Sequence, residues 1–92
     1  MRNFSFEEKL LKIMNKLYKK DRITHEALMK KVQEILTCDD ISHYKNLRRP
    51  LQAFKRVHIT GPFVLIFKYI EEENKILFYD FDHHDNIYSF SE

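Results

Sequence analysis

Two short segments of this 92-residue sequence combine residue types that transfer protons and bind phosphate. The segment "FKRVHI" (Phe54–Ile59) places Arg56 and His58 two positions apart. Near the C-terminus, "FDHHDNIYSF" (Phe81–Phe90) holds two adjacent histidines among aspartates and a tyrosine. Histidine exchanges protons near neutral pH because its unperturbed pKa is about 6.5, and arginine suits phosphate. Acid–base chemistry, a metal site and the plain end of a sheet are three interpretations of these residues.

The alternation of the first segment predicts which of its side chains are accessible. Val57 and Ile59 are apolar, so their face of a strand should meet the core. Successive side chains of a strand point to opposite faces. Arg56 and His58 should therefore lie side by side on the exposed face, as the first element of a candidate site.

The C-terminal cluster is less decisive on its own. His84 in isolation is more typical of a polar turn. His83 is expected to be an edge or turn residue that faces away from His84, because adjacent strand residues face opposite sides. Metal binding is the main rival interpretation, because carboxylates and imidazoles ligate metals. Its candidate ligands are Asp80, Asp82, His83, His84 and Asp85. No standard ligand motif is present among them, so we predict no metal and no cofactor.

Size and composition favour one intracellular domain over residues 1–92. Hydrophobic residues make up 43% of the chain, with eight phenylalanines, which is enough for a core at this length. Cys38 is the lone cysteine, so neither an internal disulfide nor a Cys-rich zinc site is expected. No apolar run approaches the roughly 20 residues that span a bilayer. We expect a soluble cytoplasmic protein that does not bind membranes.

Charge is segregated along the chain although the formal net charge is only +2. Residues 71–92 carry seven acids against one lysine, whereas residues 41–70 carry no acid at all. The basic residues of that acid-free stretch are Lys45, Arg48, Arg49, Lys55, Arg56 and Lys68. Such a stretch is suited to a polyphosphate, and chance clustering on a solvated surface explains it about equally well.

The elements that must position these residues form an α+β pattern. Helical spacing of apolar residues predicts helices over about 6–20 and from an N-cap at Thr24 to about Thr37, with "RNFSF" before them as a possible short strand. The strands expected after the helices are 54–59, 63–70, 75–82 and 86–90. The strand at 63–70 is almost wholly apolar, as in a strand covered on both faces. We predict two N-terminal helices packed on one face of a small, mainly antiparallel sheet.

The order of these features resembles the RelE superfamily of toxins. The resemblance rests on the helix pair followed by "PLQ", "VHI", "FVLIFKY", a charged hairpin and "FDHHDNIY", and it covers essentially the whole chain. Within this superfamily, the sequence most resembles the YafQ branch. Members are ribosome-dependent mRNA endonucleases of type II toxin–antitoxin systems. The resemblance implies a cognate RelB-like antitoxin, the ribosome and mRNA as partners, and a toxin–antitoxin hetero-oligomer.

The resemblance also assigns site residues. His58 matches the strand histidine of the YafQ branch, Arg56 falls at a basic position of RelE, and His84 matches the late histidine. Tyr88 matches the near-terminal aromatic, and Arg49 stands where YafQ-like toxins have a histidine. Together with the basic stretch, this gives His58, His84, Arg56 and Tyr88 as catalytic candidates and Arg48, Arg49, Lys55 and Lys68 as RNA- or phosphate-binding candidates.

In the family's reaction, a 2′-hydroxyl of mRNA attacks the adjacent phosphate. This needs a base, an acid for the leaving 5′-oxygen, and cations for the charge on phosphorus, but no metal. His58 and His84 could supply the proton transfers in either order, and Tyr88 could stack on a base or hold the hydroxyl.

The sequence departs from the family pattern at three points, of which Val64 and the C-terminal end favour an alternative function. Val64 stands where RelE has a functional arginine, and Arg56 and Pro62 replace acids of the YafQ branch. The chain also ends four residues after Tyr88, which predicts that the C-terminal helix of RelE is missing. The alternative function is a non-catalytic module that binds nucleic acid or protein, such as a toxin homologue that has lost activity.

Overall fold

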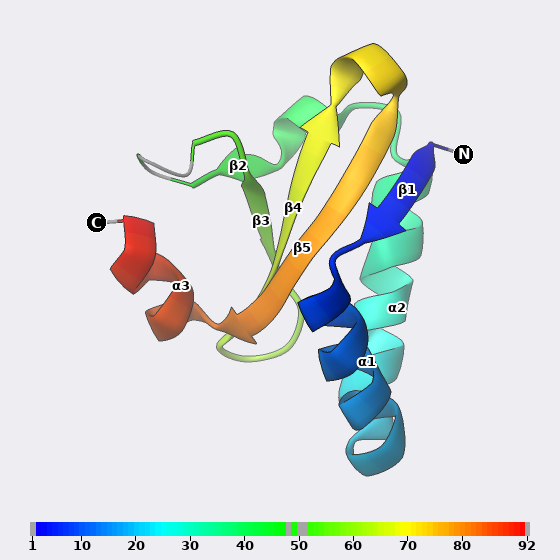
Figure 1. Cartoon of the computed structure of the whole chain (residues 1–92), viewed down its shortest axis with the longest axis vertical. Helices are drawn as coiled ribbons and strands as arrows, with labels where there is room; N and C mark the ends of the chain where they lie inside the picture. The colour runs from blue at the N-terminus through cyan, green and yellow to red at the C-terminus, as the bar shows by residue number, and fades with distance from the viewer. Residues whose placement is uncertain (1, 48, 50–51, 92) are drawn as a thin grey trace.

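The computed structural model describes residues 2–47, 49 and 52–91, and Figure 1 shows two helices beside a five-stranded sheet. In chain order the elements are β1 (Asn3–Phe6), α1 (Glu8–Lys20), α2 (Arg22–Thr37), the 3-10 turn η1 (Ile41–His43), β2 (Lys45–Asn46), β3 (Lys55–His58), β4 (Phe63–Ile70), the 3-10 turn η2 (Glu71–Glu73), β5 (Lys75–His83) and α3 (His84–Ser91). The strand order is β1-β5-β4-β3-β2. Only the β1–β5 pair is parallel among these pairs. The α+β class with a mainly antiparallel sheet is confirmed.

The two N-terminal helices form an antiparallel hairpin with a one-residue connection. Asp21 ends α1, where its backbone N–H donates to the Leu17 carbonyl at 2.7 Å. Its carboxylate also caps α2, because it accepts from the backbone N–H of Thr24 at 3.1 Å and from the Thr24 hydroxyl at 2.6 Å. The predicted N-cap at Thr24 is therefore wrong by three residues. The short loop leaves Asp21 as the last non-helical residue before α2, and these hydrogen bonds lower the pKa of its carboxyl. No described helix combines the length and apolar character needed to cross a membrane.

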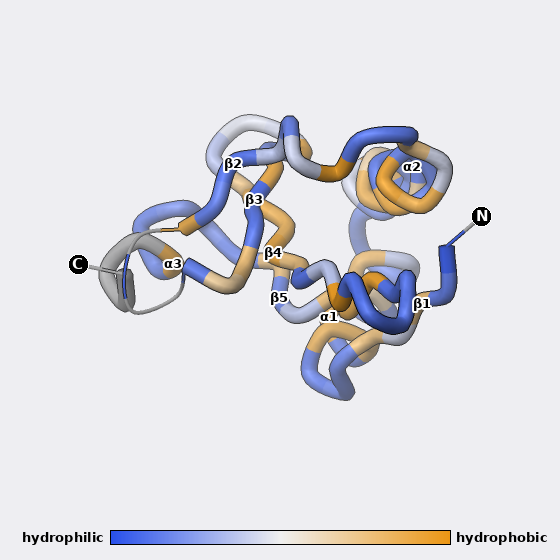
Figure 2. Tube along the Cα trace, turned by 90° about the horizontal axis from the view of Figure 1, so that it is seen from above, coloured by the Kyte–Doolittle hydropathy of each residue, from blue (hydrophilic) through white to orange (hydrophobic). Residues whose placement is uncertain are grey.

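The main core lies between this helix pair and one face of the sheet, which we call the helix face. Leu10 of α1 and Leu28 and Ile35 of α2 are fully buried against Phe67 of β4 and Phe78 of β5. Complete burial of one such side chain stabilises the fold by roughly 1.5–3 kcal/mol. Figure 2 shows the helix pair on one side of the row of strands and α3 on the other.

A second, smaller cluster lies on the opposite face of the sheet. Val64 and Ile66 of β4 pack there with Leu47, which follows β2, and with Ile87 of α3. The side chains of β4 thus point alternately into the two cores, and those of Val64 to Phe67 are all buried. The prediction of a central strand covered on both faces is confirmed.

The chain after His83 differs from the sequence prediction, because residues 84–91 form helix α3 and not a strand at 86–90. The expectation that a C-terminal helix is missing is wrong for the same reason. Phe63, which starts β4, pairs with His83, so β5 has no antiparallel partner beyond that point. Backbone groups without a ladder must find partners locally, as a helix provides. Apolar spacing around Ile87 fits a helical turn as well as a strand.

Candidate functional site

The sheet face opposite the helix pair carries a group of basic side chains. We call it the basic face and define it by Lys45, Arg56, His58 and Lys68. In the antiparallel ladder, Lys45 pairs with Arg56, Arg56 with Ile66, and His58 with Val64. Both β4 partners belong to the smaller cluster, so Arg56 and His58 share that face. The Lys68 ammonium lies 5.9 Å from the centroid of the Phe54 ring, which packs on the same cluster.

The side of the sheet predicted for Arg56 and His58 is confirmed. Val57 and Ile59 pack against the main core, while His58 is exposed and Arg56 is half-buried. Lys45 was not singled out from the basic stretch, because a two-residue strand leaves no periodic pattern from which its neighbour across the sheet could be inferred.

Lys55 lies apart from the basic face. It pairs with Phe67 on the helix face, and its ammonium donates to the Tyr44 carbonyl at 3.1 Å and to Asn46 Oδ1 at 3.0 Å. The sequence held the signal for this separation, because Lys55 and Arg56 are adjacent in a strand and must face opposite ways. Arg49 is exposed in the segment between β2 and β3.

Two of the expected site residues are not described in full. Arg48 lies outside the described residues, and for Tyr88 only the backbone is described, within α3.

The two candidate catalytic histidines lie at the same end of the sheet. His58, Val64 and Asp82 follow one another across three strands, and two strand spacings of about 4.8 Å place the Cα atoms of His58 and Asp82 about 10 Å apart. His84 comes two residues after Asp82 and opens α3. Its backbone N–H donates to the carbonyl of Pro62, in the turn between β3 and β4, at 2.8 Å.

His83 and His84 lie together, which contradicts the expectation that they face opposite sides. Their rings stack with centroids 4.8 Å apart. Their Nδ1 atoms lie 3.6 Å and 3.1 Å, respectively, from the two carboxylate oxygens of Asp85. Strand alternation fails here because the helical backbone begins at His84.

The neighbouring aspartates hold the local structure. The Asp82 carboxylate accepts from the His83 backbone N–H at 2.7 Å and from the Asn86 side-chain amide at 3.1 Å. Both bonds stabilise the turn from β5 into α3. Asp80 lies 3.5 Å from the Lys9 ammonium and so connects β5 to α1.

Tyr44, which directly precedes β2, is held in place by contacts on the helix face. The Tyr44 hydroxyl donates to Glu34 Oε1 at 3.2 Å, and its ring meets Phe67 edge-on at 5.5 Å. Burial, and then the charge of Glu34, raises the pKa of Tyr44 to about 12. The hydrogen bond from Lys31 lowers the pKa of Glu34. This anchor keeps β2 beside β3 and thus positions Lys45 next to Arg56.

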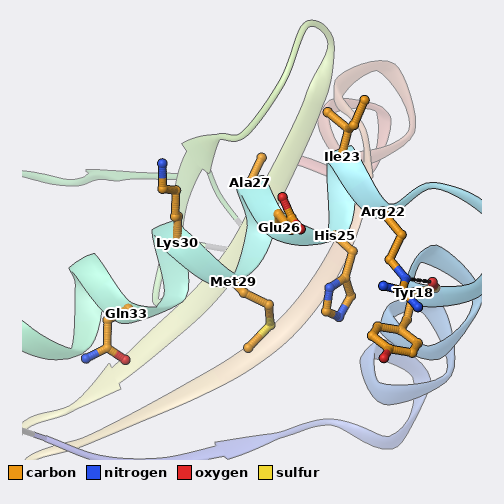
Figure 3. A pocket seen from close by; sticks show the side chains of 9 residues that line it. All are labelled: Tyr18, Arg22, Ile23, His25, Glu26, Ala27, Met29, Lys30 and Gln33. Atoms are coloured by element: carbon orange, nitrogen blue, oxygen red, sulfur yellow. Dashed lines mark hydrogen bonds between the residues drawn. The ribbon is translucent and has the colours of Figure 1, made fainter.

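A separate hollow of about 750 Å³ lies along α2, away from the basic face. Figure 3 shows Ile23, Met29 and Tyr18 among its lining residues. Ile23 is 80% exposed, which is unusual for so large an apolar side chain.

Comparison with known proteins agrees with this architecture. No protein-family model matches the chain. A protein of Methanocaldococcus jannaschii named "Putative toxin RelE4" is 52% identical over 77 residues, which are 84% of this chain and 80% of that protein. This chain belongs to the RelE superfamily of toxins.

Solved structures show that this toxin has the fold of its superfamily. A chain of the intact E. coli RelBE toxin-antitoxin complex superposes with a TM-score of 0.71 at 21% identity, covering 90% of this chain and 96% of that one. A metal-bound toxin from Helicobacter pylori gives a TM-score of 0.76 at 21% identity, covering 95% and 99%. At such identities the likeness concerns the fold alone.

Proposed function

We propose that this toxin is an endoribonuclease that cleaves mRNA on the ribosome without a metal cofactor and thereby inhibits translation. The observation that carries the proposal is that Arg56 and His58, two positions apart on β3, share the basic face, with His84 at the same end of the sheet. The ribosome as substrate carrier comes from the family resemblance, and it makes the cytoplasm the place of action.

The proposed reaction is attack of a 2′-hydroxyl on the adjacent phosphorus. One histidine removes the hydroxyl proton, and the other donates a proton to the 5′-oxygen as the P–O bond breaks. His58 and His84 fill these two roles. Arg56 stands beside His58 and offsets the negative charge that grows on the phosphoryl oxygens.

The remaining basic residues are proposed to hold the RNA on either side of the cleaved bond. Lys45 and Lys68 on the basic face, and Arg49 in the exposed segment beside it, would contact flanking phosphates, as would Arg48. Tyr88 would stack on a base. For Lys55, whose ammonium already has two partners, the role is to hold β2 against β3 so that Lys45 stays beside Arg56.

The cognate partner is proposed to be a RelB-like antitoxin that forms a hetero-oligomer with this toxin. RelE of E. coli forms a complex with an antitoxin, and an acidic, partly disordered partner would complement the acid-free stretch 41–70. The hollow along α2, with exposed Ile23 and Met29, offers a second contact for an apolar segment of that partner.

One observation favours the alternative function of a non-catalytic binding module. Val64, at the position of a functional arginine in RelE, is completely buried in the smaller cluster. The Val64 side chain can therefore supply no positive charge there, and in the proposed reaction this role falls to Arg56.

The deciding experiment is inducible expression followed by mapping of mRNA ends on ribosomes. The wild type should arrest growth and cut mRNA, and His58→Ala with His84→Ala should relieve both. His25→Ala, on α2 beside Tyr18, is the matched control and should remain toxic. Purified toxin should cut ribosome-bound mRNA with EDTA present, once free magnesium is set to preserve the ribosome.

Two results would contradict the proposal. A folded double variant that is as toxic as the wild type would remove the two histidines from the mechanism. A wild-type protein that binds ribosomes or RNA but leaves mRNA intact would establish the alternative.

A further inference from the structure

The cluster of His83, His84 and Asp85 contains more ligand-forming atoms than the proposed acid–base reaction uses. One nitrogen of each histidine and one carboxylate oxygen of Asp85 lie within 4.8 Å of one another. The three residues are consecutive and arise at the junction of β5 and α3. We propose that they form a binding site for a divalent transition metal such as Zn²⁺, and that the bound metal inhibits the toxin by occupying His84.

The distances already approach those of a metal site. Zn²⁺ binds imidazole nitrogen and carboxylate oxygen at about 2.0–2.2 Å in a tetrahedral arrangement, so ligand atoms lie roughly 3.4 Å apart. The carboxylate oxygens of Asp85 lie 3.1 Å from His84 Nδ1 and 3.6 Å from His83 Nδ1. Rotation of the exposed carboxylate together with both half-exposed rings would bring one oxygen and two nitrogens around a single ion.

The site is held in shape by its surroundings. The His83 ring packs edge-on against Phe63 with centroids 5.9 Å apart, and its Nδ1 accepts from the Asp85 backbone N–H at 3.2 Å. That bond assigns the ring proton to Nε2 when the histidine is neutral and leaves the lone pair of Nδ1 on the backbone N–H of Asp85, so a metal ion would have to replace this hydrogen bond. The two histidine side chains are 37% and 38% exposed, and Asp85 is 76% exposed, so an ion can enter directly.

The donor set selects the class of metal. Two imidazoles and one carboxylate suit Zn²⁺, Ni²⁺ or Cu²⁺, whereas Mg²⁺ and Ca²⁺ prefer oxygen ligands alone. The positive end of the α3 dipole opposes any cation here. Binding therefore depends on metals that form strong bonds to imidazole nitrogen, and water completes the coordination.

Inhibition follows from the position of His84 and rests on the proposed function. With Nδ1 of His84 donated to a metal ion and the proton on Nε2, the imidazole has no lone pair left and cannot take up a proton from RNA or be recharged as an acid. His83 has no part in the proposed cleavage, so it serves as a ligand that can be removed while the reaction is left intact. The bound metal would thus inhibit cleavage by occupying the catalytic histidine His84.

The experiment measures binding and cleavage separately on the full chain. Isothermal titration with Zn²⁺, and with Mg²⁺ as the contrast, is carried out on the wild type, His83→Ala and Asp85→Asn. Every protein is also measured with Cys38→Ser added, because the Cys38 sulfur lies 3.7 Å from His43 Nδ1 and could bind Zn²⁺ by itself. Circular dichroism confirms folding. Asp85→Asn keeps the shape of an exposed side chain and so covers the case in which His83→Ala fails to fold.

The expected result is one Zn²⁺ per chain at this site, no measurable Mg²⁺ binding, and affinity at least about 10-fold weaker in either variant. Cobalt substitution should shift the ring NMR signals of both His83 and His84. Equal Zn²⁺ affinity in the wild type and both variants, or binding lost with Cys38→Ser alone, would overturn the site.

Cleavage of ribosome-bound mRNA then tests whether the bound metal inhibits the toxin. Zn²⁺ should abolish cleavage by the wild type, a chelator should restore it, and His83→Ala should cut with or without Zn²⁺. Zn²⁺ binding that depends on His83 without any effect on a cleaving wild type would refute inhibition. A wild type that binds Zn²⁺ at this site but never cleaves would refute the proposed function and leave the metal site standing.

Discussion

The two faces of the sheet differ in the size of their apolar cores and in the charge of their exposed side chains. The helix face is sealed by α1 and α2 over large, fully buried side chains such as Phe67, Phe78 and Leu10. The basic face has a small apolar cluster around Val64 and Ile66, with Arg56, His58 and Lys68 beside it. Stability is therefore concentrated on one side of the sheet, which leaves the other free to carry charged groups that contribute little to folding.

This contrast matters because a domain of 92 residues has only a small free energy of unfolding. Exposed charges contribute little to the free energy of unfolding, so a substitution such as His58→Ala on the basic face should leave stability nearly unchanged. The contrast can be tested by substitutions that separate stability from activity.

The largest effect is expected from Phe67→Ala on the helix face. Removing a fully buried phenylalanine leaves a cavity and should lower the free energy of unfolding by about 3–5 kcal/mol. Urea unfolding followed by circular dichroism measures this. A loss below about 1 kcal/mol would mean that the helix face is not the main source of stability.

His58→Ala on the basic face should show the reverse pattern. Cleavage of ribosome-bound mRNA should fall by roughly 10²–10⁴-fold, the scale of one general acid or base. The free energy of unfolding should change by less than about 0.5 kcal/mol, because His58 is exposed. Single-turnover cleavage and urea unfolding are measured on the same preparation. Parallel loss of stability and activity would show that the two faces are not separable.

Ile87→Ala should fall between these two cases. Ile87 attaches α3 to the smaller cluster, so its truncation should cost about 2 kcal/mol, the lower end for a buried isoleucine. It should also slow cleavage, because His84 opens that helix. Ile87→Val, which keeps most of the contact, should cost about 0.5–1.5 kcal/mol and retain cleavage. Full activity in Ile87→Ala would show that docking of α3 does not position His84.

The smallest effect concerns pH and belongs to the helix face. The pKa of Tyr44 is raised to about 12 by burial and by Glu34, so the folded state keeps its proton after the unfolded state, with a pKa near 10, has lost it. Stability from this group is complete below pH 10 and declines as pH rises through about 12. Tyr44→Phe should flatten part of that decline in urea unfolding, whereas Tyr18→Phe, at an exposed ring, should not. Identical profiles for the wild type and Tyr44→Phe would contradict this assignment.

Local periodicity was sufficient to predict much of this molecule. The spacing of apolar residues gave both helices, and the alternation around Val57 and Ile59 correctly placed Arg56 and His58 on the accessible face. The same rule separates Lys55 from Arg56. These features depend on side-chain direction within a single element, which the backbone geometry of a helix or strand fixes locally.

Only the tertiary structure decided the conformation of the chain after His83 and the pairing of the strands. Residues 84–91 suit a strand or a helix by pattern, and the end of β4 at Phe63 selects the helix by leaving β5 without a partner. That choice stacks His83 on His84 and brings both to Asp85. The tertiary structure also sets β2 beside β3 and so adds Lys45 to the basic face. Sequence determines the direction of each side chain within its element, but hydrogen-bond partners between distant segments determine where an element ends and which elements become neighbours.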